Sequence, residues 1–143
     1  MSMDMSAQEM IDFLSESNLA RIATVKPNCS PHVSPVWYLW EKNQLLIAIP
    51  RTSVKTRNIR KNNKVAVTID NNIGPKGVII EGTAEIEELD EEIELTLIRR
   101  YVSPENLDKY VEYAHADLPS VLLRIRPEKI ITWDYSKLNL NFL

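Results

Sequence analysis

The segment Ile49–Val67, IPRTSVKTRNIRKNNKVAV, links two apolar runs through a stretch of hydroxyls and cations. Pro50 ends the first run, and Thr52 or Ser53 can cap a short helix that extends to about Asn62. The first turn of a helix presents unpaired N–H groups and the positive end of the helix dipole, and both favour an anion. The pattern therefore predicts a phosphate site at this helix start.

The side chains around this start have the chemistry that a phosphate requires. Arg51, Ser53 and Lys55 surround it, so we predict that they hold the phosphate. The alternative is a helix whose charged face is simply solvated, and Arg60 and Lys61 fit that alternative better.

The composition is that of a single soluble globular domain, residues 1–143. The formal net charge of −3 argues against a nucleic-acid partner and makes a local basic cluster more informative. No apolar run is long enough to span a membrane, and the N-terminus does not resemble a signal peptide, so we expect a cytoplasmic protein with no membrane partner. The single cysteine, Cys29, is compatible with a reducing compartment. The cysteine and the two histidines, His32 and His115, lack the spacing of a metal site, so we expect no metal and treat both histidines as structural or surface residues.

Hydrophobic periodicity and turn residues predict a mainly β fold with peripheral helices. Pro35, within an otherwise apolar segment, indicates an edge strand or a bulge. We expect strands over 19–26, 31–40, 44–49, 64–70, 77–87, 120–126 and 128–135, helices over 6–17, 53–62 and 90–100 and from Ser103 onward, and a loop over 71–76. Such a chain predicts an antiparallel sheet of these seven strands that closes into a barrel. Several strands are apolar on both faces, which favours a homodimer.

A ring attached to the phosphate would need aromatic and apolar walls together with a few backbone polar groups. Pro35, Val36 and Trp37 can supply them, because proline leaves neighbouring carbonyls without a ladder partner and Trp37 offers a ring face. The alternative for Trp37 is a place in the core or in an interface, which its size fits equally well. This combination suits flavin mononucleotide (FMN). The glycine-rich patterns of dinucleotide folds and P-loops are absent.

The order and spacing of these motifs resemble the small flavin-binding split barrels related to pyridoxamine 5'-phosphate oxidase. The similarity spans about residues 19–88 and rests on RIAT (21–24), PHVSPVW (31–37), SVKTRNIRKN (53–62), VAV (65–67) and IEGTA (80–84). The resemblance implies a mainly β fold, a six- to seven-stranded antiparallel split β-barrel, in a homodimer with two FMN sites at the subunit interface. The candidate cofactor-binding residues are Pro35, Val36, Trp37, Ile49, Arg51, Thr52, Ser53, Lys55, Arg57 and Asn58.

Departures from that family indicate that cofactor binding carries over better than vitamin oxidation. Val33 and Tyr38 stand where the vitamin oxidases carry an RxxxLK pattern, and no glutamine lies near Gly77. The C-terminal tryptophan–arginine segment of those enzymes is also missing, and Trp133 has either a structural role or a place in the partner's site. Arg57 fits a phosphate contact or a salt bridge across the dimer.

The leading functional hypothesis is an FMN-dependent oxidoreductase that acts on a small-molecule substrate or electron donor. No side chain stands out as a catalytic acid or base. The alternatives are a non-catalytic flavin-binding or sensing module and a relative that holds a deazaflavin or haem in the same cleft. Single-stranded nucleic-acid binding through the basic helix is the remaining alternative, which the acidic net charge opposes.

Overall fold

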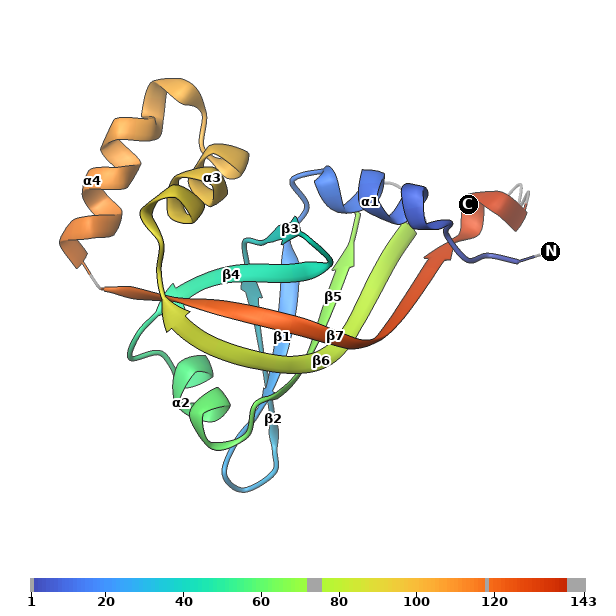
Figure 1. Ribbon diagram of the computed structural model, residues 1–143, viewed down its shortest axis with the longest axis horizontal. Coiled ribbons are helices and arrows are strands. Elements are labelled where there is room, and N and C mark those ends of the chain that lie inside the picture. Colours follow the sequence, from blue (N-terminus) through green and yellow to red (C-terminus); the bar gives the residue numbers. More distant parts are fainter. Residues whose placement is uncertain (1, 72–75, 118, 139–143) are drawn as a thin grey trace.

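The computed structural model describes residues 2–71, 76–117 and 119–138, and the strands in these residues form one antiparallel sheet of seven strands (Figure 1). They are β1 (Ala20–Val25), β2 (Pro31–Val36), β3 (Leu39–Glu41), β4 (Gln44–Pro50), β5 (Lys64–Asp70), β6 (Lys76–Glu88) and β7 (Ser120–Asp134). Their spatial order is β2-β1-β5-β6-β7-β4-β3. The predicted mainly β, antiparallel fold is confirmed.

The sheet curls into a barrel that stays open between its two edge strands. Within the described residues, no hydrogen-bonded ladder joins β2 to β3. In Figure 1, β1, β2 and β5 run across the direction of β4 and β7, and this crossing encloses the core. The core includes Ile22, Leu45, Ile47, Val67, Ile69, Ile80, Leu123 and Ile125. Pro35 lies on edge strand β2, as its missing N–H predicts.

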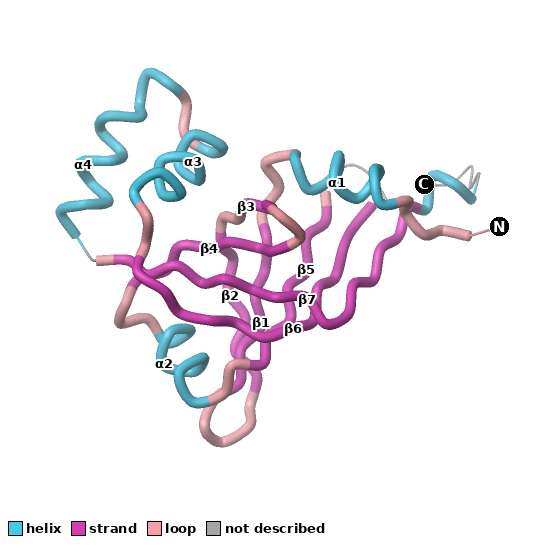
Figure 2. The backbone as a smooth tube through the Cα atoms, in the orientation of Figure 1, coloured by secondary structure: helices cyan, strands magenta, loops and turns pink. Residues whose placement is uncertain are grey.

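The helices lie around the rim of the barrel (Figure 2). They are α1 (Ala7–Ser15), α2 (Val54–Lys61), α3 (Glu91–Tyr101) and α4 (Leu107–Asp117), with short 3-10 helices η1 (Pro104–Asn106) and η2 (Tyr135–Leu138). Ser6 and Glu9 close the capping box at the start of α1. The α3–α4 hairpin connects β6 to β7 and stands beyond the ends of the strands. Of the loop expected over 71–76, residues 72–75 lie outside the described residues.

The single strand expected over 31–40 is wrong, because the chain leaves the ladder at Trp37 and Tyr38. β2 pairs with β1, whereas β3 pairs with β4. The Tyr38 ring is fully buried, and its hydroxyl donates to the carbonyl oxygens of Leu14 (3.0 Å) and Glu16 (2.9 Å). This anchor to the end of α1 accounts for the break, since a continuous strand could not place the ring there.

The two strands expected over 120–126 and 128–135 are also wrong, because β7 runs without interruption from Ser120 to Asp134. Pro127 lies in a β-bulge, where Gly82 faces Pro127 and Glu81 faces Lys129. A proline is tolerated at this position because a bulge disrupts the regular ladder. A Cβ on Gly82 would lie 2.1 Å from the carbonyl oxygen of Arg126, so the close approach of the two strands requires glycine.

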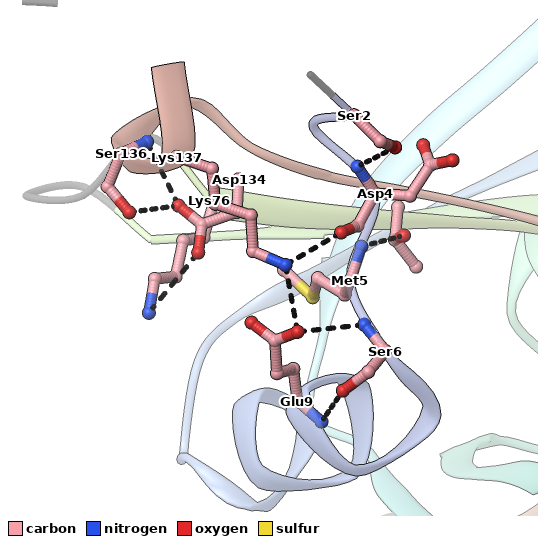
Figure 3. A network of polar contacts seen from close by, with 10 residues as sticks. Ser2, Asp4, Met5, Ser6, Glu9, Lys76, Asp134, Ser136 and Lys137 are labelled. Carbon is pink, nitrogen blue, oxygen red and sulfur yellow. Dashed lines mark hydrogen bonds and ion pairs between the residues drawn. The ribbon is translucent and has the colours of Figure 1, made fainter. Parts of the chain in front are cut away.

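The N-terminal segment is bound to the end of β7 (Figure 3). The backbone N–H of Asp134 donates to the carbonyl oxygen of Met3 at 2.8 Å. The ammonium of Lys137 donates to the carbonyl oxygen of Asp4 and to Oε1 of Glu9, each at 2.8 Å. These contacts hold α1 against one end of the sheet.

Candidate functional site

The junction of β4 and α2 forms the predicted helix start, and Ser53 is the capping residue. The Ser53 hydroxyl accepts the N–H of Thr56 at 3.3 Å and lies 2.9 Å from the Thr56 hydroxyl. Because the Thr56 hydroxyl donates to the carbonyl oxygen of Pro50 (2.8 Å), the Ser53 hydroxyl must donate to Thr56. The Ser53 side chain is therefore already engaged in the cap, so a phosphate would have to share it.

Donors without acceptors remain at the same helix start. Among the described residues, no hydrogen bond is made by the backbone N–H groups of Val54 and Lys55. The Lys55 side chain is partly buried, and this burial lowers the pKa of its ammonium. Its ammonium forms no ion pair within the described part of the chain. Two free N–H groups and an unpaired, partly desolvated cation fit the oxygens of a phosphate.

Arg51, immediately before the helix, has a carboxylate partner. Its guanidinium donates to both carboxylate oxygens of Glu88, at 2.9 and 3.3 Å. The interaction raises the pKa of Arg51 and lowers the pKa of Glu88. The backbone N–H of Arg51 donates to the carbonyl oxygen of Pro119 at 2.9 Å, which joins this corner to the start of β7. An incoming phosphate would therefore compete with Glu88 for the guanidinium.

The other candidate residues have different surroundings. Asn58 is buried, and its amide donates to the Thr24 hydroxyl at 3.0 Å. Ile49 and Val36 belong to the core, while Pro35 and Thr52 are exposed. Arg57 and Asn58 line a cleft of about 520 Å³ beside the β1–β2 turn, together with Lys26, Pro27, Asn28, Val54, Arg60 and Lys61.

A second cleft lies between the α3–α4 hairpin and the ends of β4 and β7. This hairpin cleft has a volume of about 560 Å³. Trp37 and Arg51, both predicted site residues, line it, whereas Ser53 and Lys55 line neither this cleft nor the one beside α2. Its remaining lining residues are Ala48, Pro50, Glu88, Leu89, Glu94, Leu97, Ile98, Tyr110, Tyr113, Ala114, His115, Pro119 and Ser120.

Aromatic rings form one wall of the hairpin cleft. Trp37 stacks on Tyr101, with ring centroids 4.8 Å apart and planes 5° apart. Tyr110 contacts Trp37 at 5.4 Å, and Tyr113 contacts Tyr110 at 6.0 Å. Burial, together with Tyr113 and Glu94, raises the pKa of Tyr110, so its hydroxyl keeps its proton at neutral pH.

The sequence alone did not identify α3 and α4 as part of a site. In the sequence of α4, Tyr110 lies in one apolar stripe with Leu107, Val111 and Ala114, and such a stripe is typical of core packing. His115 was expected to be structural or superficial, yet its Nε2 lies 2.7 Å from Oε1 of Glu94, and both residues line the cleft. The signal that could have indicated a site is the pair Tyr110 and Tyr113, three residues apart where purely aliphatic residues would suit a core.

The described residues contain neither a metal-binding cluster nor a membrane-spanning helix. No group of three or more His, Cys, Asp or Glu side chains there is arranged to hold a metal ion. None of the helices within those ranges has the length and hydrophobicity needed to cross a bilayer.

Comparison with known proteins gives one family match and several structural matches. The model of the family described as pyridoxamine 5'-phosphate oxidase matches residues 6–134. The crystal structure of conserved hypothetical protein Rv2991 from Mycobacterium tuberculosis has a TM-score of 0.81 and 26% identity, covering 100% of this chain and 94% of that chain. A FAD-binding protein from Mesorhizobium loti has a TM-score of 0.61 and 25% identity, and the match covers 90% of this chain and 94% of that protein. An F420 reductase has a TM-score of 0.68 and 23% identity, and the match covers 84% of this chain and 94% of that protein. This likeness supports the fold alone.

Proposed function

The chain belongs to the pyridoxamine 5'-phosphate oxidase family, and on that premise we propose that it is an FMN-binding flavoprotein that acts as an oxidoreductase. The observation that carries the proposal is that the Lys55 ammonium is partly buried and has no ion-pair partner among the described residues. A partly desolvated cation without a counter-ion is unfavourable in the free protein, and it becomes favourable once an anion binds beside it. The family match and a neighbour described as FAD-binding support a flavin as the group attached to that anion.

The proposed cofactor site uses the helix start for the phosphate and strand backbone for the ring. Lys55 and the N–H groups of Val54 and Lys55 would hold the phosphate, with Arg51 contributing when it is released from Glu88. Backbone around Pro35–Trp37 would contact the ring. Bound flavin would supply two-electron chemistry, and the protein's part is to position the ring and exclude water.

We also propose a cytoplasmic homodimer with the cofactor sites at the subunit interface. Val33 on edge strand β2 is 62% exposed, and Ile130 and Ile131 on β7 are also exposed. Large exposed apolar side chains on a sheet favour a partner surface, and a second copy supplies one by symmetry. The exposed free thiol of Cys29 is in keeping with a reducing compartment.

The test compares FMN with riboflavin, which lacks the phosphate. Lys55→Ala should weaken FMN binding roughly ten- to hundredfold, because a charge-assisted hydrogen bond contributes about 1.5–3 kcal/mol. Riboflavin affinity should stay unchanged, and Lys42→Ala, in the exposed turn before β4, should change neither affinity. Equal losses for FMN and riboflavin would refute the phosphate assignment, and a protein that binds neither ligand would refute the proposed function.

A deazaflavin in the same place is the second candidate, and one observation favours it. Lys26, Arg57, Arg60 and Lys61 line the cleft beside α2, and none of them forms an ion pair within the described part of the chain. A cofactor with anionic groups beyond a single phosphate would use these cations. Competition between FMN and F420 for the purified protein, followed by the visible spectrum, separates the two candidates.

A further inference from the structure

The hairpin cleft has the properties of a second binding site beside the proposed cofactor. Its volume of about 560 Å³ lies within the usual range for small-molecule pockets. Trp37 and Arg51 belong both to the proposed cofactor set and to its lining, so a molecule in the cleft would lie next to the cofactor.

The aromatic wall selects a flat ring. Trp37 and Tyr110 line the cleft, whereas Tyr101 supports Trp37 from outside the lining set. Because Trp37 is held in a stack with Tyr101, the wall is ordered before a ligand arrives. Rings packed in this way offer a broad apolar surface to another planar molecule.

The charged side chains of the lining select against an anion. Arg51 is bound by both oxygens of Glu88, and His115 lies within hydrogen-bond distance of Glu94. Every cationic or potentially cationic group in the lining therefore already has a carboxylate partner. An anionic ligand would have to displace a carboxylate, whereas an uncharged ligand leaves both pairs intact.

Two tyrosine hydroxyls in the lining, those of Tyr110 and Tyr113, have no acceptor in the described part of the chain. Of the two, Tyr110 is the one whose ring packs against Trp37, so its hydroxyl lies beside the aromatic wall. Burial, aided by Tyr113 and Glu94, raises the pKa of Tyr110, which keeps this hydroxyl a donor at neutral pH. An uncharged acceptor oxygen on the ligand would satisfy it.

We propose that the hairpin cleft binds a flat, uncharged, conjugated carbonyl compound, with its ring on Trp37 and its carbonyl oxygen on the Tyr110 hydroxyl. The role of this compound as the substrate of the flavoprotein rests on the proposed function, whereas its binding does not. Tyr110 is then a specificity-determining residue, because it distinguishes a carbonyl compound from a hydrocarbon of the same shape.

The experiment uses equilibrium dialysis to measure the affinity of the protein for menadione and for 2-methylnaphthalene. The second compound has the same methyl-substituted two-ring skeleton without carbonyls. Wild-type protein should bind menadione more tightly. Tyr110→Phe should weaken menadione binding about three- to tenfold, as expected for one neutral hydrogen bond, and leave 2-methylnaphthalene binding unchanged. Tyr135→Phe, the same chemical change in η2, should alter neither affinity.

Equal affinity of wild-type protein for the two compounds would overturn the proposal, as would an equal effect of Tyr110→Phe on both. Tighter binding of 2-naphthoate than of menadione would also overturn it, since the cleft would then select anions. Thermal unfolding of Tyr110→Phe checks that the variant is folded. Flavin content, read from the visible spectrum of the same samples, reports separately on the proposed function.

Discussion

The indole of Trp133 lies against Gly77, its cross-strand partner, and a methyl group at Gly77 would come within 2.1 Å of Cζ2 of that ring. The ring can occupy this position only because the facing residue has no side chain. Gly77→Ala should therefore displace the ring and lower the free energy of unfolding by about 1–3 kcal/mol, the usual cost of overpacking. Urea denaturation of the two proteins measures this difference.

The same relationship tests whether the role of Trp133 is structural. In a Trp133→Leu background the obstruction is smaller, so Gly77→Ala should cost less there than in the wild type. Trp133→Leu should retain FMN affinity if the indole serves packing only. If Gly77→Ala lowers the free energy of unfolding equally in both backgrounds, the indole ring is not the cause of the destabilisation.

The Lys55 charge should lower the free energy of unfolding of the cofactor-free protein, although it favours the binding of a phosphate. Lys55→Met keeps a long side chain of similar helix propensity and removes the partly buried charge, so it should raise the free energy of unfolding of the cofactor-free protein by roughly 0.5 kcal/mol. The figure is small because solvent still screens part of the ammonium. The same variant should bind FMN more weakly.

The stability gain of Lys55→Met should depend on pH. Burial lowers the pKa of Lys55 in the folded state, so the charge opposes folding at neutral pH. The penalty disappears as the pH rises toward the unfolded-state pKa of about 10.4. The stability gain of Lys55→Met should therefore shrink as the pH rises toward about 10 and should be lost above that pH, and a gain that is constant with pH would point to packing instead.

Local signals in the sequence predicted the elements whose causes are local. The Ser6–Glu9 box and the Ser53 cap involve residues three apart, and both form as expected. Pro50 is the last residue of β4, and Pro35 lies on an edge strand. The two caps depend on backbone N–H groups within one helical turn of the capping residue. The two prolines act through the N–H that each of them lacks at its own position in the ladder.

Features with distant causes could not be predicted in this way. The break after β2 depends on the Tyr38 hydroxyl reaching the carbonyl oxygens of Leu14 and Glu16, more than 20 residues earlier. The hairpin cleft depends on how α4 folds back against α3 beyond the ends of the strands. A helical stripe such as that of Tyr110 gives the same sequence pattern whether it faces a core or a cleft. Side-chain placement across the chain, and not local propensity, decides both.

The Glu9–Lys137 contact should contribute to acid stability (Figure 3). The hydrogen bonds from Lys137 and Ser6 lower the pKa of Glu9 from 4.5 to about 2. A carboxylate with a depressed folded-state pKa stabilises the fold above its unfolded-state pKa, and this contribution is lost as the pH falls. The stability difference between wild type and Glu9→Gln should be constant from pH 7 to about pH 5 and should shrink between about pH 4.5 and pH 2.

A matched variant controls for the general effect of acid. Asp12→Asn removes a carboxylate on the same helix that accepts only from the Gln8 amide, at 2.8 Å, so it tests whether any acidic side chain on α1 gives the same profile. A Glu9→Gln difference that does not change between pH 5 and pH 2 would contradict the assigned role of Lys137.

Glu88 should restrain the cofactor affinity, because its carboxylate binds the Arg51 guanidinium that a phosphate would use. Glu88→Gln removes this competing charge and leaves a side chain of the same size. FMN should then bind more tightly, by up to about fivefold given the usual strength of an exposed ion pair, and the gain should diminish in high salt. Riboflavin affinity should not change. Glu85→Gln provides the control, since Glu85 pairs with Arg126 at 3.3 Å on β7 and not with the helix start. Tighter FMN binding in both variants would mean that net charge, and not the release of Arg51, sets the affinity.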